Sequence, residues 1–335
     1  MRMRELLGQP RLIERLGERL SEGEASHAYL ITGPRSIGKR TLALRIAQTL
    51  SCETGRVPGG CGRCLPCRKI ERGVHPDVRA IEKPTDKERI SIEQVREMQR
   101  DLVLKPLEGE WRVVILDDAA ELSLDAQHSL LKTLEEPPAH AVLLVLTRTP
   151  QGIEETIVSR CQPLALRPIP TERIRRFIAE STGDERLATL VAPLAQGRPG
   201  AALLLAGDTA ERTRRLAMID ELFDLVGMRL VDRFGFANRA AQEASRDRAG
   251  LEERLTLWLE LLRDACVGSA VTPLHPDRVT RTERLAVGAG TGRLARTAAL
   301  VTRLRDDLDR NSNARTALEL LMLDLPYIGE FAGAA

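Results

Sequence analysis

The stretch AYLITGPRSIGKRTLALRIAQTL, residues 28–50, decides the fold. A short apolar run, AYLIT, is followed by the turn GPRSIGKR and then by a segment with helical spacing. The turn matches the phosphate-loop pattern G-x-x-x-x-G-K, in which backbone N–H groups and the helix N-terminus bind phosphate oxygens and the lysine reaches the terminal phosphates. We therefore expect Gly33, Gly38 and Lys39 to form a nucleotide-binding loop between a strand and a helix.

The loop departs from the pattern at its last position. Arg40 stands where a Ser or Thr hydroxyl normally binds Mg²⁺, and Thr41 follows one residue late, about 100° further round the helix. The flanking strand and helix predict phosphate-loop ancestry, but binding of ATP and Mg²⁺ stays open, and hydrolysis is the least favoured activity. The alternative is a glycine-rich strand-to-helix turn that is kept for its shape.

A second part of such a site is an apolar strand that ends in acids, and VVILDDAA (113–120) supplies it. Asp117 is placed to hold Mg²⁺ through water, and Asp118 stands where ATPases of this kind usually carry a glutamate that orients the attacking water. Because aspartate is one methylene shorter, this position also argues against efficient hydrolysis. Taken alone, the two acids also fit a solvated turn or a helix N-cap.

Four further short apolar runs predict strands. Helical segments separate them, for example SIEQVREMQRDL (91–102) and SLDAQHSLLKTL (123–134), which each begin with a serine suited to an N-cap. Strands this short and this continuously apolar are typical of a parallel sheet that helices cover on both faces. The four runs are DVRAI (77–81), VVIL (113–116), AVLLVLT (141–147) and PLAL (163–166).

The chain changes character after about residue 167. The strand signal ends there and only amphipathic helices follow, one of which carries Leu255 and Trp258 on its apolar stripe. The 335 residues are enough for about two or three domains. We therefore expect an α/β domain over residues 1–167, a small helical domain over 168–211 and a larger helical domain over 212–335.

The composition excludes several classes of protein. Lys and Arg number 50 against 48 Asp and Glu, so a net charge of +2 excludes a strongly basic nucleic-acid coat and an acidic tail. No run approaches the ~18 apolar residues of a membrane helix, and the first residues contain no signal-peptide core. We expect a cytoplasmic protein with no membrane partner, in which any nucleic-acid contact depends on a local patch or on partners.

Four of the six cysteines lie close together in the sequence. Cys52, Cys61, Cys64 and Cys67 have the spacing C-x8-C-x2-C-x2-C. In a reducing compartment this clustering indicates a metal rather than disulfides, and four thiolates without an open position predict a structural Zn²⁺ site. The alternatives are free thiols in a loop or a redox pair. His75 could add a ligand, although a turn or core histidine is the better interpretation.

These features together resemble the clamp-loader branch of the bacterial AAA+ ATPases. Its members carry a phosphate loop, a four-Cys zinc module directly after the loop's helix, an acidic strand end and a run like LLKTLEEPP (130–138). Ser159, Arg160 and Cys161 look like the SRC motif of this family, whose arginine reaches the γ-phosphate of ATP on the neighbouring subunit. The resemblance implies an arginine finger at Arg160, since a permanently charged planar guanidinium stabilises charge on the transferred phosphoryl group.

The resemblance also implies roles for two other positions. Thr147, in AVLLVLT, corresponds to a nucleotide-sensing residue, whereas Gly200 stands where the family's ATPase subunits carry a third nucleotide-sensing arginine. Without the family pattern, Arg160 would be expected to pair with Glu154 or Glu155 on its own surface. The chain thus keeps the residue that acts on a neighbour's ATP and lacks several that act on its own.

By resemblance, the chain is a non-hydrolysing or weakly nucleotide-binding subunit of a ring-shaped hetero-pentamer. Its expected fold is an AAA+, RecA-like α/β domain with the zinc module at about 50–70, followed by a helical lid (168–211) and an all-α collar (212–335). The expected partners are the gamma/tau ATPase subunits, a delta subunit, the sliding clamp and, through the complex, primed DNA. The runner-up is a gamma/tau-type subunit that binds and hydrolyses ATP itself.

Overall fold

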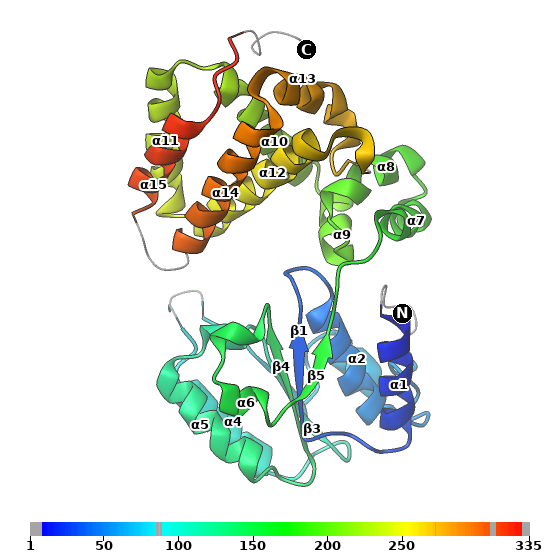
Figure 1. The fold of residues 1–335 in the computed structure, drawn as a ribbon. Coiled ribbons are helices and arrows are strands. Elements are labelled where there is room, and N and C mark those ends of the chain that lie inside the picture. Colours follow the sequence, from blue (N-terminus) through cyan, green and yellow to red (C-terminus); the bar gives the residue numbers. More distant parts are fainter. Residues whose placement is uncertain (1–8, 85–86, 88, 272, 309–312, 330–335) are drawn as a thin grey trace. The chain divides into compact units, whose positions relative to one another are not determined.

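The computed structural model describes residues 9–84, 87, 89–271, 273–308 and 313–329, and Figure 1 shows its ribbon. The chain divides into two compact units. The first comprises Met1–Glu180 with Gly197–Leu203, and the second comprises Ser181–Gln196 with Leu204–Ala335. The first eight residues, in which no signal peptide is expected, lie outside the described ranges.

A five-stranded parallel sheet forms the centre of the first unit. The strand order is β2-β3-β4-β1-β5, so that β1 lies between β4 and β5. Each predicted apolar run forms one of the strands, and the predicted parallel sheet is confirmed. The strands are β1 (Ala28–Thr32), β2 (Val78–Ile81), β3 (Arg112–Leu116), β4 (Ala141–Thr147) and β5 (Gln162–Ala165).

Helices cover both faces of this sheet (Figure 1). The helices of the first unit are α1 (Pro10–Ser21), α2 (Lys39–Ser51), α3 (Leu65–Glu71), α4 (Ile92–Val103), α5 (Leu124–Glu135), α6 (Glu155–Val158) and most of α7 (Thr171–Thr182). Alternate residues of β3 face opposite layers, because Val113 and Ile115 belong to the core with α1 and α2, whereas Val114 and Leu116 belong to the core with α4 and α5. Burial on both faces explains why the strands are continuously apolar.

Two serines mark the starts of α4 and α5, as predicted. Ser91 N donates a hydrogen bond to Gln94 Oε1 (3.1 Å) within a capping box, and Ser123 Oγ accepts one from Ala126 N (3.2 Å). Each cap satisfies a backbone group that the first turn of the helix leaves without an intrahelical partner.

The second unit is helical over its described residues. The predicted apolar stripe lies on α12, where Leu255 and Trp258 are fully buried. Its helices are α8 (Glu185–Leu194), α10 (Thr209–Gly227), α11 (Leu230–Ala244), α12 (Arg248–Val267), α13 (Val279–Ala289), α14 (Thr291–Leu308) and α15 (Ala314–Asp324), while α9 (Pro199–Gly207) crosses the boundary between the units. None of the helices within the described ranges is long and apolar enough to cross a membrane.

The boundary between the two compact units falls inside the segment 168–211. Part of this segment belongs to the first unit and part to the second. The division into an α/β domain, a lid and a collar therefore stays a prediction, and each unit is considered by itself below.

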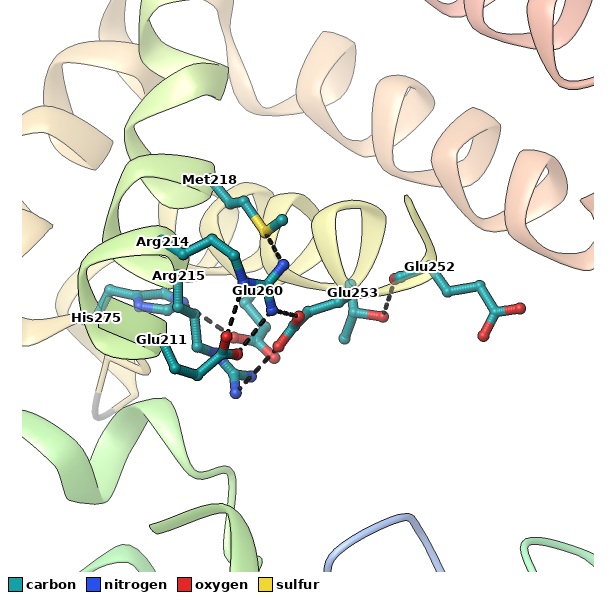
Figure 2. A network of polar contacts seen from close by, with 9 residues as sticks. Glu211, Arg214, Arg215, Met218, Glu252, Glu253, Glu260 and His275 are labelled. Carbon is teal, nitrogen blue, oxygen red and sulfur yellow. Dashed lines mark hydrogen bonds and ion pairs between the residues drawn. The ribbon is translucent and has the colours of Figure 1, made fainter. Parts of the chain in front are cut away.

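A polar network joins α10 to α12 within the second unit (Figure 2). Arg214 donates two hydrogen bonds to Glu211 (2.7 and 2.8 Å) and one to Glu253 (2.6 Å). Arg215 Nη1 lies 3.3 Å from Glu253 Oε1, so a single carboxylate on α12 contacts two consecutive arginines of α10. These polar contacts between α10 and α12 add to the apolar packing around Trp258.

Arg233 on α11 is a buried cation that has no carboxylate partner among the described residues. The residue is 3% exposed. Its guanidinium donates hydrogen bonds to backbone carbonyls at the C-terminal ends of α10 and α15, where helix carbonyls lack intrahelical partners and carry partial negative charge. The carbonyls, at 2.7–3.4 Å, belong to Leu225, Val226, Met322, Leu325 and Pro326. Arg233 therefore fastens α15 to the rest of the bundle.

Replacing Arg233 by methionine is expected to lower the free energy of unfolding of the second unit by about 3–5 kcal/mol, because its buried carbonyl partners lose their donor. Unfolding in urea is followed by Trp258 fluorescence in a Trp111→Phe background, which isolates the signal of this unit. Arg229→Met, at a side chain 85% exposed, is the matched control and is expected to change stability by less than about 0.5 kcal/mol. Equal effects of the two substitutions would contradict the capping role.

Candidate functional site

The phosphate loop connects β1 to α2 at the carboxyl edge of the sheet. Two of its residues adopt backbone conformations that favour glycine, with φ 147° at Gly33 and φ 109° at Gly38. A Cβ at Gly33 would also lie 2.6 Å from Leu166 O, where no side chain fits. Gly38 is the N-cap of α2, so the loop ends directly at the helix N-terminus. The sequence pattern and the backbone geometry agree at both glycines.

Lys39 folds back over its own loop. Its Nζ donates hydrogen bonds to Gly33 O (2.7 Å) and Pro34 O (3.2 Å). Burial lowers the pKa of Lys39, and attraction by Asp118 and Asp117 partly opposes this shift. The ammonium group therefore lies inside the loop and close to both aspartates that the sequence singled out.

Arg40 points to the acidic strand end. Its Nη1 lies 3.1 Å from Asp117 Oδ2 and also forms an ion pair with Glu82, which follows β2. Burial works against the charge, but hydrogen bonds and attraction from Glu82 and Asp117 raise the pKa of Arg40. A guanidinium thus lies on the carboxylate that would hold Mg²⁺ in an ordinary phosphate-loop ATPase. Thr41, which follows, is half-buried at the start of α2.

The remaining predicted nucleotide residues lie at the same edge of the sheet. Asp117 and Asp118 directly follow β3, and Asp118 has a positive φ of 59° that turns the chain sharply into the next segment. Thr147, at the end of β4, is fully buried, and its Oγ1 donates a hydrogen bond to Thr149 O (2.9 Å). In the register of the sheet Thr147 pairs with Thr32, the last residue before the phosphate loop.

Gly200 lies directly against the phosphate loop. Its N–H donates a hydrogen bond to Ser36 O (2.9 Å), and a Cβ at Gly200 would lie 2.7 Å from the same oxygen. Ser36 itself has a positive φ of 61°, which is uncommon for a residue other than glycine. The start of α9 therefore rests on the loop through a glycine, at the position where the resemblance places an arginine in ATPase subunits.

The four clustered cysteines come together where α2 ends and α3 begins, with Cys67 on α3 itself. The Sγ atoms of Cys52, Cys61, Cys64 and Cys67 all lie within 4.8 Å of one another, which suits tetrahedral coordination of one metal ion. Backbone N–H groups donate to sulfur, from Cys61 to Cys52 (3.4 Å) and from Cys64 to Cys61 (3.3 Å). His75 is outside this cluster, since its Nδ1 accepts a hydrogen bond from Asp77 N (3.1 Å).

The donor set fits a bound cation. A hydrogen bond from Thr54, followed by those from the N–H groups of Cys64 and Arg63, lowers the pKa of Cys61 to about 5, so this sulfur is a thiolate at neutral pH. Burial raises the pKa of Cys67, and a metal ion would favour its thiolate form instead. A Cβ at Gly60 would lie 2.8 Å from Cys67 Sγ, so the loop passes too close to the cluster for any other residue.

The SRC run lies at the end of α6. Arg160 Nη2 donates a hydrogen bond to Glu135 Oε1 (2.8 Å), its Nη1 donates one to Thr156 O (2.9 Å), and the side chain is 37% exposed. The carboxylate partner is thus Glu135, and neither Glu154 nor Glu155 takes this place. Glu154 instead lies 2.8 Å from His128 Nε2.

The two residues beside Arg160 have different environments. Ser159 is exposed, and its Oγ donates a hydrogen bond to Thr156 O (3.1 Å). Cys161 belongs to the core that α4 and α5 form with the sheet, and burial raises its pKa to about 12. The Cys161 thiol is therefore neutral at physiological pH and packs as an apolar group. Only the arginine of the three presents a charge to solvent.

Sequence reasoning missed Glu82, Glu135 and Ser36. Glu82 was not identifiable as the partner of Arg40, because the pairing depends on β2 lying beside β3. Glu135 stands in the LLKTLEEPP run, which could have identified it only if the contact between α5 and α6 had been known. Ser36 carries no local signal, since its role lies in the conformation of its backbone.

The fold and the loop define the class of protein. A phosphate loop after an interior strand, a parallel sheet in the order β2-β3-β4-β1-β5 and acids directly after β3 are the arrangement of an AAA+-type α/β domain. The domain carries a four-Cys cluster after α2 and is followed by helices. The expected fold class is confirmed.

Comparison with known proteins narrows this class. The family model described as DNA polymerase III, delta subunit, matches residues 8–170. The delta' subunit of DNA polymerase III from Bacillus subtilis is 27% identical over 321 residues, which cover 95% of this chain and 96% of that protein. The delta' subunit from Pseudomonas aeruginosa is 34% identical and covers 62% of each chain. The chain is thus similar to subunits of DNA polymerase III, and over 95% of its length it aligns with a delta' subunit.

The tau subunits match over a shorter part of their length. The tau subunit of Escherichia coli is 34% identical over 70% of this chain and 38% of that protein, and the chain spans 28% of the tau subunit of Salmonella typhimurium. Among solved structures, a gamma-subunit-related protein from Thermotoga maritima gives a TM-score of 0.45 at 19% identity, with 93% of this chain and 97% of that chain covered.

Replacing Cys61 by serine is expected to abolish stoichiometric metal binding, because only three thiolates remain and each ligand of a four-sulfur site is needed to close the coordination shell. Metal content is measured on the purified chain by elemental analysis. Cys266→Ser is the matched control, since Cys266 is outside the cluster and its thiol donates a hydrogen bond to Thr291 O (3.8 Å). Equal metal content in the two variants would contradict a four-sulfur site.

Proposed function

We propose that the chain is a delta'-type subunit of the DNA polymerase III clamp loader, which places the sliding clamp on primed DNA in the cytoplasm. Its partners are gamma/tau ATPase subunits and a delta subunit in a hetero-pentamer. The observation that carries this proposal is the alignment over 95% of the chain with a delta' subunit. In this role residues 1–167 are the AAA+ domain, 168–211 the lid and 212–335 the collar.

The altered residues of the chain's own nucleotide site support the proposal that this subunit does not hydrolyse ATP. Arg40 pairs with Asp117, and Gly200 occupies the position of a nucleotide-sensing arginine. Asp118 is shorter than the glutamate that normally orients water. Each departure removes a group that hydrolysis needs, while the phosphate loop and Lys39 keep the groups that contact phosphate. Gly33, Gly38, Lys39, Thr41 and Thr147 form the rest of this degenerate site.

Arg160 acts in this proposal on ATP that a neighbouring subunit binds. Within the described ranges its carboxylate partner is Glu135, whose side chain is 53% exposed. A solvent-exposed ion pair of this kind is worth roughly 0–1 kcal/mol, so Arg160 can exchange Glu135 for a phosphoryl group at little cost. Ser159 and Cys161 flank the arginine, and the burial of Cys161 in the core fixes the backbone from which Arg160 projects.

The four-Cys cluster holds Zn²⁺ in this proposal. Four sulfurs leave no position for water or substrate, so the ion cross-links the loop between α2 and α3 and takes no part in a reaction. The same donor set could bind other soft cations, and metal analysis of the purified chain distinguishes them.

A gamma/tau-type ATPase is the second candidate. The intact glycines of the phosphate loop and Lys39 on that loop favour it. It requires the purified chain alone to hydrolyse Mg·ATP. Hydrolysis by the isolated chain that is lost in Lys39→Ala would establish this candidate and overturn the first.

Arg160→Ala is expected to reduce clamp- and DNA-stimulated ATP turnover at the neighbouring subunit by about tenfold or more, because arginine fingers supply ~10³–10⁵ in phosphoryl transfer. The reconstituted complex is assayed for ATP turnover and for clamp loading, and its assembly is checked by size-exclusion chromatography.

Two controls separate catalysis from assembly. Arg303→Ala, at an exposed side chain on α14, removes an arginine elsewhere and should leave turnover unchanged. Glu135→Gln removes the resting partner of Arg160 and should leave turnover equal or higher. Normal clamp loading by a fully assembled Arg160→Ala complex would refute the arginine-finger role.

A further inference from the structure

The phosphate loop presents unpaired backbone N–H donors at the N-terminal end of α2. Within the described part of the chain, the backbone N–H groups of Ser36, Gly38, Lys39 and Arg40 donate no hydrogen bond, whereas the N–H of Leu42, one turn into the helix, bonds to Gly38 O (2.9 Å). These donors converge where a phosphate group binds in other phosphate loops. The loop therefore retains the backbone part of an anion site.

The residues around the loop do not fit Mg²⁺. Mg²⁺ requires oxygen ligands in near-ideal octahedral geometry and is usually bound through a carboxylate, a hydroxyl and substrate phosphates. Here the hydroxyl is replaced by Arg40, and the carboxylate of Asp117 is already paired with that arginine at 3.1 Å. The pair uses Asp117 Oδ2, so Mg²⁺ on the same carboxylate would lie close to the guanidinium of Arg40. A metal ion and the Arg40 guanidinium would then repel each other.

We propose that this loop binds the polyphosphate of a nucleotide without Mg²⁺, with the guanidinium of Arg40 supplying the positive charge that the metal ion supplies elsewhere. The inference rests on the proposed degenerate nucleotide site and assigns it a ligand form, the metal-free nucleoside triphosphate. Arg40 is the residue that sets this preference.

The charge and exposure of Arg40 suit this role. Its side chain is 50% exposed, and its hydrogen bonds to Glu82 and Asp117 both leave from Nη1, which keeps Nε and Nη2 available to phosphate oxygens. A guanidinium presents five donors in a fixed planar fork that matches phosphate geometry. Glu82 and Asp117 thus hold Arg40 at the loop and orient its guanidinium.

Neighbouring cations favour the binding of a free triphosphate at this loop. Arg35 and Arg148 are close enough to Lys39 to lower its pKa, although burial is the larger cause. Together with Lys39 and Arg40 they place four cations around the loop, against the carboxylates of Glu82, Asp117 and Asp118. This balance favours an incoming polyanion over a divalent cation.

The experiment measures ATP affinity of the full-length chain by isothermal titration calorimetry, once with excess Mg²⁺ and once with EDTA. The wild-type chain is expected to bind ATP at least as tightly in EDTA as with Mg²⁺. Arg40→Thr restores a hydroxyl and frees Asp117, so it is expected to bind ATP about tenfold or more tightly with Mg²⁺ than in EDTA. Lys39→Ala should lose binding under both conditions.

Arg303→Thr is the matched control, because it makes the same change at an exposed arginine on α14 of the other unit and should behave as the wild type. Asp117→Asn serves as a second variant if Arg40→Thr fails to fold. It removes one of the two carboxylates that pair with Arg40 and thereby a negative charge, so it is expected to tighten ATP binding in EDTA, and weaker binding would contradict the proposal.

Three results would overturn the inference. They are tighter binding by the wild-type chain with Mg²⁺, metal-independent binding that persists in Arg40→Thr, and no ATP binding by the wild-type chain under either condition. None of them affects the clamp-loader assignment, which is tested separately by Arg160→Ala in the assembled complex.

Discussion

The first unit depends on the interior position of β1, between β4 and β5, in a sheet whose strands all run in the same direction. Because parallel strands end at one edge, the segments after β1, β3 and β4 meet there even though they are far apart in the sequence. The register places Thr32 opposite Thr147 and Leu116 opposite Val145. This constraint brings the phosphate loop to the acids after β3, and it is the reason that Arg40 can reach Asp117.

Sequence patterns were sufficient for the strands and for the cysteine cluster, because both depend on local chemistry. A strand buried on both faces must be continuously apolar, and four cysteines with short spacings can converge without help from the rest of the fold. Side-chain pairing is different. Arg40 meets Glu82 because β2 lies beside β3, and Arg160 turns to Glu135 on α5 because α5 and α6 pack together. Strand order and helix packing arise from the whole core, and no local motif contains them.

The cysteine cluster and the phosphate loop lie at the two ends of the same helix, α2. Gln48 on α2 donates a hydrogen bond from Nε2 to Cys67 O (2.9 Å), and Arg45 Nη1 donates one to Gln48 Oε1 (2.6 Å). Both side chains are buried. Hydrogen bonds therefore connect the cysteine cluster to the C-terminal half of the helix whose N-terminal end forms the loop. A metal ion bound by the four sulfurs would brace this end of α2.

Arg40 and Arg160 differ in how firmly carboxylates hold them. Arg40 has two partners, Glu82 and Asp117, on two adjacent strand ends, so releasing it requires two pairs to break at once. Among the residues that the structure describes, Arg160 has a single carboxylate partner, Glu135, at the end of α5. A singly held, solvent-exposed guanidinium exchanges partners at little free-energy cost, whereas a doubly held one stays in place. The same residue type is therefore suited to a fixed charge inside the chain's own loop and to a transferable charge at its surface.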